Sequence, residues 1–443
     1  MKVLVINCGS SSLKYQLFDM NAESVLAKGL VERIDGSQIK HTKTGMEAVV
    51  KETPIPDHKV GIQLVLDALM DKGHGVLSSL DELSAVGHRV VHAGEKFSTS
   101  VKLDPQVMAA LRECIPLAPL HNPANIMGIE AVTEVLPSVP QVAVFDTAFH
   151  QTMPEHAYIY GLPYGYYEKY KVRRYGFHGT SHYYVSRRAA EILDKPVERL
   201  KIVTCHLGNG SSITAVQGGR SIDTSMGFTP LAGVLMGTRC GDMDCALPFY
   251  IMRKTGMSAA EMDTALNKKS GLLGITGKYV DRRDVTKAAA EGDEKARLAL
   301  EMECYRLRKY FGAYLAAIGP VDAIVFTAGV GEFAPHIRAK AVAGLEFLGV
   351  KMDPAKNELA RTRNAETCIS ADDSKIKIFV IPTDEELVMT EDAYALMKGT
   401  YDVHTNFTYS FQSKDYVNKA REEGLKKDLE KNPELKRILA LPR

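Results

Sequence analysis

The stretch that decides the fold lies at the N-terminus and reads Val3-Leu-Val-Ile-Asn-Cys-Gly-Ser-Ser-Ser-Leu-Lys-Tyr-Gln-Leu-Phe18. Apolar residues 3–6 predict a strand, the small polar residues 7–12 a turn, and the alternation over 13–18 a second strand. A Gly/Ser turn offers backbone N–H groups and hydroxyls, and Lys14 adds a cation, so this hairpin has the parts of a phosphate cradle. It is not a P-loop, because the Gly-x4-Gly-Lys spacing is absent and a strand follows. A plain hairpin turn is the alternative interpretation.

A second hairpin of the same design occurs near the middle of the chain. Its strands are predicted over 201–206 and 213–216, and the turn between them reads Leu207-Gly-Asn-Gly-Ser-Ser212. Further on, a predicted strand over 323–327 precedes the glycine turn Ala328-Gly-Val-Gly331 and a helix through 337–345. Two similar hairpins half a chain apart indicate an internal duplication of one α/β domain.

Helical patterns alternate with these strands, and polar segments separate them. Helices are predicted over 60–72, 181–194, 258–267 and 286–318. Residues 36–58 are polar and carry two prolines, which indicates a hairpin or loop excursion. The alternation of strands and helices predicts the α/β class throughout.

Length and composition exclude several classes of protein. A chain of 443 residues has room for two or three domains of about 150 residues each. With 55 basic and 54 acidic residues the net charge is +1, so neither nucleic acid nor a membrane surface is an expected partner. No apolar run approaches the ~18 residues that span a bilayer, and no signal peptide is evident. We therefore expect a cytoplasmic protein.

The seven cysteines do not predict a disulfide framework, and they favour a reducing compartment. Cys240 and Cys245, with four residues between them, would need two more ligands to hold zinc. Burial as small hydrophobic residues is the better interpretation.

Five further strings carry a resemblance to a known family. They are His88-Arg-Val-Val-His-Ala-Gly-Glu95, Ala118-Pro-Leu-His-Asn-Pro123, Phe145-Asp-Thr-Ala-Phe-His150, Tyr175-Gly-Phe-His-Gly-Thr-Ser-His182 and Gly237-Thr-Arg-Cys-Gly-Asp-Met-Asp244. With the hairpins, they resemble the acetate kinase (acetokinase) family from residue 1 to about 395. That family belongs to the superfamily of acetate and sugar kinases, actin and hexokinase.

The resemblance implies two duplicated actin/hexokinase-like (ribonuclease H-like) domains with an interdomain cleft for ATP and substrate. An N-terminal lobe over 1–150 would be completed by a helix from about 386–398. A C-terminal lobe with the nucleotide site would span 151–385, and residues 399–443 would form an appendage. A homodimer is also implied.

The activity implied by the resemblance is reversible, Mg²⁺-dependent transfer of a phosphoryl group from ATP to acetate, by direct in-line transfer, giving acetyl phosphate and ADP. A propionate or short-chain carboxylate kinase and a pyrophosphate-using acetate kinase are alternatives. An actin-like ATPase is a more distant one, because it has no use for Arg89, His178 and Arg239 around a small apolar pocket.

Such a reaction brings two anions together, so cations must gather where the phosphoryl group is transferred. The resemblance places Arg89, His121, His178 and Arg239 there and adds Asp146 as the essential acidic residue, which makes five catalytic residues. A carboxylate substrate is already ionised at pH 7 and needs no general base. We therefore expect Asp146 to orient Arg or His groups, or water around Mg²⁺. His88, His92 and His182 are expected to be core residues.

The resemblance also implies the positions that bind the substrates. The acetate site comprises Arg89, Val91, Leu120, Phe177 and Pro230. The metal positions, for Mg²⁺ or Mn²⁺, are Asn7 and Glu385. The ATP positions are Ser10, Ser12, Lys14, His206, Leu207, Gly208, Asn209, Gly210, Asp281, Arg282, Arg283, Gly329, Val330, Gly331, Glu332 and Phe333. Residues 271–277 are predicted to form a loop against the adenosine.

The third glycine turn departs from the family pattern. The family usually reads Gly-Gly-Ile-Gly-Glu-Asn where this chain has Ala328-Gly-Val-Gly-Glu-Phe333. Phe333 either stacks on adenine or narrows its pocket, so the nucleotide preference depends on this residue.

Overall fold

In the computed structural model the chain forms two compact units, and the structure describes residues 1–9, 11–32, 37–119 and 121–440. The first unit contains Met1–Gln151, Asp384–Ser410 and Tyr416–Glu423. The second contains Thr152–Thr383, Phe411–Asp415 and Gly424–Arg443. The sequence strings quoted above thus lie inside these two units.

The first unit is built on a mixed sheet with the strand order β5-β4-β3-β2-β1-β6-β8-β7 among the described residues. The strands are β1 (Lys2–Cys8), β2 (Ser12–Asp19), β3 (Ser24–Glu32), β4 (Gln38–Lys43), β5 (Val49–Glu52), β6 (Leu83–Val90), β7 (Val101–Lys102) and β8 (Gln141–Phe145). Its helices include α1 (His58–Leu69), α2 (Pro105–Glu113), α3 (Asn122–Val135) and α15 (Glu385–Lys398). β1 and β2 pair antiparallel with Asn7 opposite Lys14, which is the hairpin that the sequence predicts.

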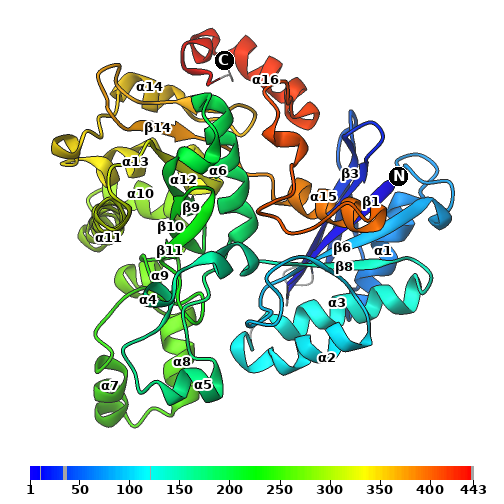
Figure 1. Cartoon of the computed structure of the whole chain (residues 1–443), viewed down its shortest axis with the longest axis horizontal. Helices are drawn as coiled ribbons and strands as arrows, with labels where there is room; N and C mark the ends of the chain where they lie inside the picture. Colours follow the sequence, from blue (N-terminus) through cyan, green and yellow to red (C-terminus); the bar gives the residue numbers. More distant parts are fainter. Residues whose placement is uncertain (10, 33–36, 120, 441–443) are drawn as a thin grey trace. The chain divides into compact units, whose positions relative to one another are not determined.

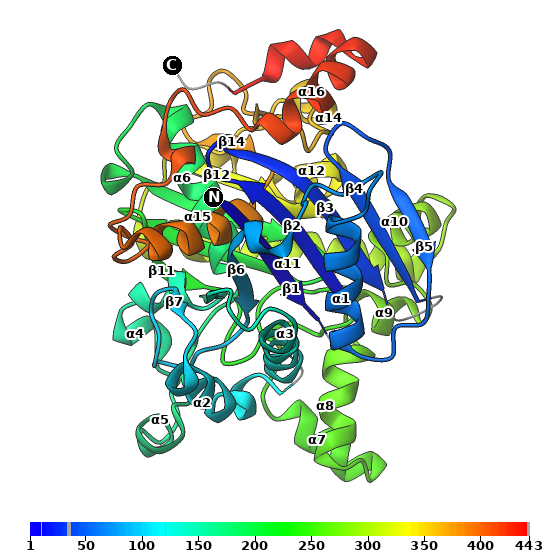
Figure 2. The same cartoon turned by 90° about the vertical axis from the view of Figure 1, so that its right-hand side faces the viewer.

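Helices cover both faces of this sheet because β1 is apolar on both sides. Leu4 and Ile6 pack with α1 and α3, which cross one face (Figure 2). Val3 and Val5 pack with Met389 and Ala393 of α15 on the other face (Figure 1). Successive side chains of a strand point to opposite faces, so the continuous apolar run Val3–Ile6 reads as a strand buried on both sides.

The second unit repeats this design with the strand order β11-β10-β9-β12-β14-β13. Its strands are β9 (Lys201–Leu207), β10 (Ser211–Gln217), β11 (Arg220–Thr224), β12 (Ala323–Thr327), β13 (Thr367–Cys368) and β14 (Lys377–Val380). In both units three antiparallel strands are followed by two strands parallel to the first, β6 and β8 in one and β12 and β14 in the other. The shared order confirms the predicted duplication.

The helices of the second unit are more numerous. They are α4 (Glu155–Tyr158), α5 (Gly165–Tyr170), α6 (Gly179–Leu193), α7 (Leu247–Thr255), α8 (Ala259–Lys268), α9 (Gly271–Thr276), α10 (Arg282–Ala290), α11 (Glu294–Ile318), α12 (Ala328–Phe333), α13 (Pro335–Val342) and α14 (Pro354–Leu359). Val203 and Cys205 of β9 pack with α11, whereas Thr204 bonds to His182 of α6 on the opposite face. The alternation along β9 thus places a polar stripe under α6.

Two predicted segments differ from the structure. The helix predicted over 286–318 is two helices, because Gly292 has a φ of +97° and Asp293 caps α11 by accepting from the N–H groups of Lys295 and Ala296. The loop predicted over 271–277 is helix α9, whose first N–H groups donate to the carbonyls of Met236 and Gly237 at 2.9 and 3.0 Å. These two carbonyls accept hydrogen bonds from the first N–H groups of α9, so the helix supports the turn that carries Arg239.

The C-terminal segment beyond α15 contributes to both units. Tyr409 and Phe411 are buried, and α16 (Lys419–Lys431) is followed by the buried residues Leu435 and Ile438. In the second unit the Arg188 guanidinium bonds both oxygens of Glu366 and the Phe411 carbonyl. No helix among the described residues is long and apolar enough to cross a membrane.

Candidate active site

Arg89 and Asp146 form a two-bond ion pair at the ends of adjacent strands in the first unit. Arg89 lies on β6 and Asp146 directly follows β8, its parallel neighbour. The Nε and Nη2 groups of Arg89 donate to the two oxygens of Asp146 at 2.8 and 2.6 Å. The Asp146 carboxylate is only 3% exposed. A paired fork of this kind fixes the plane and direction of the guanidinium.

Further carboxylates lie around Arg89. Burial alone would lower the pKa of Arg89, but Asp146 and Glu385 offset this effect and raise it. Glu385 is the first residue of α15, whose N-cap Asp384 accepts from the N–H of Leu387. Burial, with Asp384 and Glu385 close by, raises the pKa of Glu386 to about 7. The guanidinium therefore stays charged in a partly desolvated acidic setting.

The string around His121 is tied to the end of β6 by two asparagines. Asn122 exchanges hydrogen bonds with the backbone of His92, and Asn125 accepts from the Val91 N–H at 3.0 Å. Asn125 also donates to the Cys8 carbonyl at 2.8 Å, and so reaches the first hairpin. His121 is the N-cap of α3 and lies beside these contacts. Two signature strings and the hairpin turn thus meet at one edge of the sheet.

The turn of the first hairpin is closed by its own backbone. Gly9 N–H donates to the Ser12 carbonyl at 2.8 Å, and His58 contacts the Gly9 carbonyl at 3.0 Å. Asn7 and Lys14 lie opposite each other at the base of the turn. Two sequence-predicted site residues, Ser10 and Leu120, lie outside the described residues.

Asn7 and Glu385 fit the chemistry of the metal expected from the resemblance. Both offer the hard oxygen donors that Mg²⁺ prefers. The described residues hold no cluster of three or more His, Cys, Asp or Glu side chains that could bind a metal by themselves. This donor set suits an ion carried largely by water and nucleotide phosphates.

His178 of the second unit is held by a polar chain that runs under α6. Its Nδ1 lies 2.8 Å from the Ser212 hydroxyl, which lies 2.7 Å from Nε2 of His182. His182 in turn contacts the Thr204 hydroxyl at 2.7 Å. His178 has a φ of +59°, in the left-handed region that non-glycine residues rarely adopt. The strain thus lies in the backbone of His178, as is frequent at functional sites, while the Ser212 contact holds its imidazole.

Arg239 and two histidines converge on the turn of the second hairpin. The His178 and His206 rings stack with their centroids 4.0 Å apart. A Cβ atom at Gly210 would lie 3.3 Å from Nη1 of Arg239 and 3.7 Å from the His178 ring, so glycine allows their close approach. Arg239 Nη1 donates to the Pro230 carbonyl at 3.2 Å, and burial lowers the pKa of Arg239. Phe177 adds a buried apolar wall beside His178.

The second hairpin turn is supported by a buried arginine. Arg282 pairs with Glu303 and donates to the Gly208 carbonyl at 2.7 Å. Arg282 is buried and supports the turn through the Gly208 carbonyl. Asp281 caps α10 and pairs with Arg283, whose side chain is 90% exposed.

The third glycine turn begins α12. Ala328 has a φ of +63°, and Gly329 faces open space. At the other end of α12, the buried Arg338 donates to the carbonyls of Gly331 and Glu332 at 2.8 and 3.0 Å. Phe333 is 41% exposed, and the Arg363 guanidinium lies 5.4 Å from its ring centroid.

Comparison with known proteins decides the family. The sequence profile of the acetokinase family matches residues 2–391. The chain belongs to the acetokinase family. The acetate kinase of Treponema pallidum is 60% identical over 442 residues, which cover 99% of each chain.

Solved structures of similar chains agree with this assignment. The Porphyromonas gingivalis acetate kinase superposes with a TM-score of 0.84 at 48% identity, over 89% of this chain and 99% of that one. A propionate kinase from Francisella tularensis superposes with a TM-score of 0.82 at 42% identity, over the same shares. The predicted resemblance to the acetokinase family and the predicted two-lobed α/β fold are confirmed.

Several residues that shape this acetokinase site were not predicted from the sequence. Asn122, Thr204 and Arg338 act through contacts with residues 19 to 30 positions away, which no local pattern reveals. Asn122 belongs to the string Ala118–Pro123, and this membership was the sequence signal that could have identified it. The expectation of buried cysteines fails at Cys245, which is exposed, and at Cys240, which is half-buried. His88, His92 and His182 are buried as expected.

Proposed function

We propose that the protein is an acetate kinase that transfers a phosphoryl group reversibly between ATP and acetate. The match to an acetate kinase at 60% identity over 99% of both chains carries this assignment. It confirms the class of enzyme predicted from the sequence, a phosphotransferase with a carboxyl group as acceptor (EC 2.7.2.1). ATP and acetate are accordingly its substrates.

Direct in-line transfer requires cations at the reacting groups. Arg89, His178 and Arg239 supply them, and His121 joins them from the start of α3, where its carbonyl accepts from the Asn125 N–H. The two-bond pairing with Asp146 supports an orienting role for that carboxylate, because it is already used in fixing the Arg89 fork. The stacked His178 and His206 rings beside Arg239 support a role for these donors in stabilising the charge that phosphoryl oxygens gain.

We assign the acyl group of acetate to the apolar residues Val91, Leu120, Phe177 and Pro230, and its carboxylate to Arg89. Buried Val91 and Phe177 support this assignment. The nucleotide is assigned to the turns at 10–14, 206–210 and 329–333 and to residues 281–283, with Arg282 acting through the Gly208 carbonyl. Asn7 and Glu385 would hold Mg²⁺ or Mn²⁺, which would supply positive charge to neutralise the nucleotide phosphates.

An assay that measures the formation of acyl phosphate tests the carboxylate substrate and the phosphoryl donor together. With hydroxylamine as trap, acetate and ATP should give the highest kcat/KM. Propionate should remain a weaker substrate, because one methylene changes discrimination by about 1–3 kcal/mol in an apolar pocket. A higher kcat/KM with propionate would make the chain a propionate kinase, the alternative favoured by its likeness to the Francisella enzyme. Activity with pyrophosphate in place of ATP would contradict the nucleotide assignment.

Arg239→Ala tests the assignment of the cations. We expect kcat to fall by roughly 10³-fold or more while the KM for acetate changes far less, because the lost charge acts mainly in the transition state. Arg297→Ala, which removes an exposed cation of α11, is the control. Near-normal turnover in Arg239→Ala would exclude the proposed role.

We further propose a cytoplasmic homodimer. All seven cysteines are free, which suits a reducing compartment. Helix α7 buries none of its residues and exposes Leu247, Phe249 and Tyr250. An exposed apolar cluster of this kind supports a protein–protein contact.

A further inference from the structure

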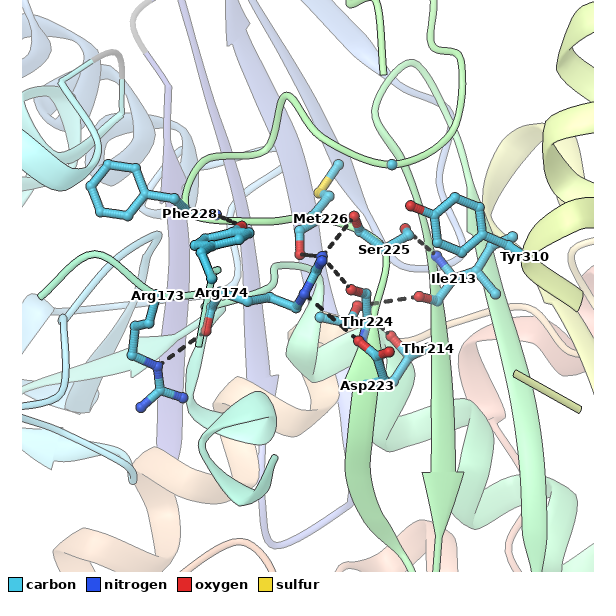
Figure 3. Close-up of polar contacts among 12 residues, drawn as sticks. Arg173, Arg174, Ile213, Thr214, Asp223, Thr224, Ser225, Met226, Phe228 and Tyr310 are labelled. Carbon is cyan, nitrogen blue, oxygen red and sulfur yellow. Dashed lines mark hydrogen bonds and ion pairs between the residues drawn. The ribbon is translucent and has the colours of Figure 1, made fainter. Parts of the chain in front are cut away.

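Arg174 binds the backbone at the point where β11 ends. Its Nη1 lies 2.8, 3.2 and 3.1 Å from the carbonyl oxygens of three consecutive residues, Thr224, Ser225 and Met226 (Figure 3). Carbonyl groups facing one cation are held more firmly than carbonyls that face solvent or neutral donors. Arg174 thus fixes the path of the chain immediately before the loop Gly227–Pro230.

The backbone next to Arg174 is joined to the same loop. The N–H groups of Tyr175 and Gly176 both point to the Gly227 carbonyl, at 3.0 and 3.3 Å. The Phe228 N–H donates to the Tyr160 hydroxyl at 2.9 Å, and a Cβ atom at Gly227 would lie 2.4 Å from that oxygen. The start of the loop therefore bonds directly to the segment 173–178, and Tyr160 leaves no room for a side chain at Gly227.

Both sides of this junction lead to site residues. The segment 173–178 continues into Phe177 and His178, and the loop ends at Pro230, whose carbonyl accepts from Arg239. Ser225 exchanges hydrogen bonds with the backbone of Ile213 on β10, the residue after the Ser212 that contacts His178. A shift at 224–226 would therefore displace Pro230 relative to Phe177.

Arg174 stays charged although its side chain is partly buried. Burial alone would lower the pKa of Arg174, but Tyr160, Tyr314 and Asp223 offset it and raise the pKa. Asp223 Oδ1 lies 3.7 Å from Nε and forms an ion pair that is too long for a hydrogen bond, so the hydrogen-bond acceptors of Arg174 are the three carbonyls that face Nη1 (Figure 3). A neutral side chain would leave those carbonyls without a charged donor.

We propose that Arg174 is a positioning residue that sets the acyl-chain preference of the enzyme by fixing the distance between Phe177 and Pro230. This inference rests on the proposed assignment of those two residues to the acyl group. Loosening the junction widens the space for the acyl chain, whereas a loss of phosphoryl transfer through His178 or Arg239 would be common to all acids and would not change their ratio.

The test compares Arg174→Gln and Arg174→Lys with the wild-type chain. In Arg174→Gln the ratio of kcat/KM for propionate to that for acetate should rise about 10-fold, the share of discrimination that one methylene carries. The KM for ATP should stay within about twofold, because Arg174 bonds to none of the nucleotide-site residues that the structure describes. Arg174→Lys keeps the charge but not the fork, so it should shift the ratio by less. Arg220→Gln, at the exposed start of β11, is the matched control.

The outcomes are distinct. An unchanged ratio in Arg174→Gln, or equal losses for both acids and for ATP, overturns the role of Arg174. If Arg174→Gln fails to fold, the ratio in Arg174→Lys decides by the same criterion. Phe177→Ala tests the pocket itself: no shift of preference there would overturn the acyl assignment of the proposed function, independently of Arg174.

Discussion

At the scale of single residues, Ala328 stands out because it carries a side chain where the backbone is left-handed. Its φ is +63°, and it opens α12 at the third glycine turn. A left-handed conformation costs a residue with a Cβ atom about 1–2 kcal/mol. The strain lies at a turn assigned to the nucleotide, which is where backbone strain is commonly stored.

Ala328→Gly should therefore stabilise the protein. We expect a gain of about 0.5–1 kcal/mol, since the relief of strain exceeds the extra backbone entropy that glycine brings to the unfolded chain. Denaturant unfolding measures it. Ala339→Gly, inside α13, is the control and should lower stability by a similar amount. A loss of stability in Ala328→Gly would show that the turn is not strained.

At the scale of elements, α15 carries two buried carboxylates that meet the C-terminal segment in the first unit. Asp392 accepts from the hydroxyls of Ser100 and Tyr409. Glu391 accepts from the N–H and hydroxyl of Ser410. Burial raises the pKa of each to about 7.

The sign of the resulting pH dependence follows from these values. The unfolded chain loses both protons near pH ~4, whereas the folded chain keeps them until about pH 7. Between these values the folded state binds more protons, so stability falls as pH rises and levels off above about pH 7. Burying an ionised carboxylate costs more than burying a protonated one.

Asp392→Asn should reduce this dependence. Its melting temperature at pH 8 should exceed that of the wild type by a few °C, and the difference between pH 5.5 and pH 8 should shrink. Asp402→Asn changes an exposed carboxylate of the same segment and should leave the difference intact. An equal pH difference in all three proteins would refute the assignment.

At the scale of the whole molecule, a net charge of +1 conceals strong local differences. The cations of the site are paired or bonded inside each unit, while apolar side chains are exposed on α7, which lies away from the sheet of its unit (Figure 1). Such exposure favours self-association of a chain that has little net charge to oppose it.

Sedimentation should therefore show a particle of twice the chain mass of 48.7 kDa. Phe249→Glu, which places a charge in the α7 cluster, should shift the equilibrium to the monomer. Phe347→Glu is the control, since Phe347 is the most exposed of the large apolar residues described. A wild-type monomer would exclude the dimer, and a dimer unaffected by Phe249→Glu would place its interface elsewhere.

The sequence by itself determined the hairpins, the α/β class and the family, because strand alternation, Gly/Ser turns and signature strings are local features. It also indicated which residue types the chemistry needs. Only the tertiary structure decided what the arginines do. Arg89 pairs with a carboxylate, Arg282 binds both a carboxylate and a backbone carbonyl, and Arg174 and Arg338 bind backbone carbonyls. Their partners are brought near by sheet pairing and helix packing, and a guanidinium takes its role from the acceptor that the fold places before it.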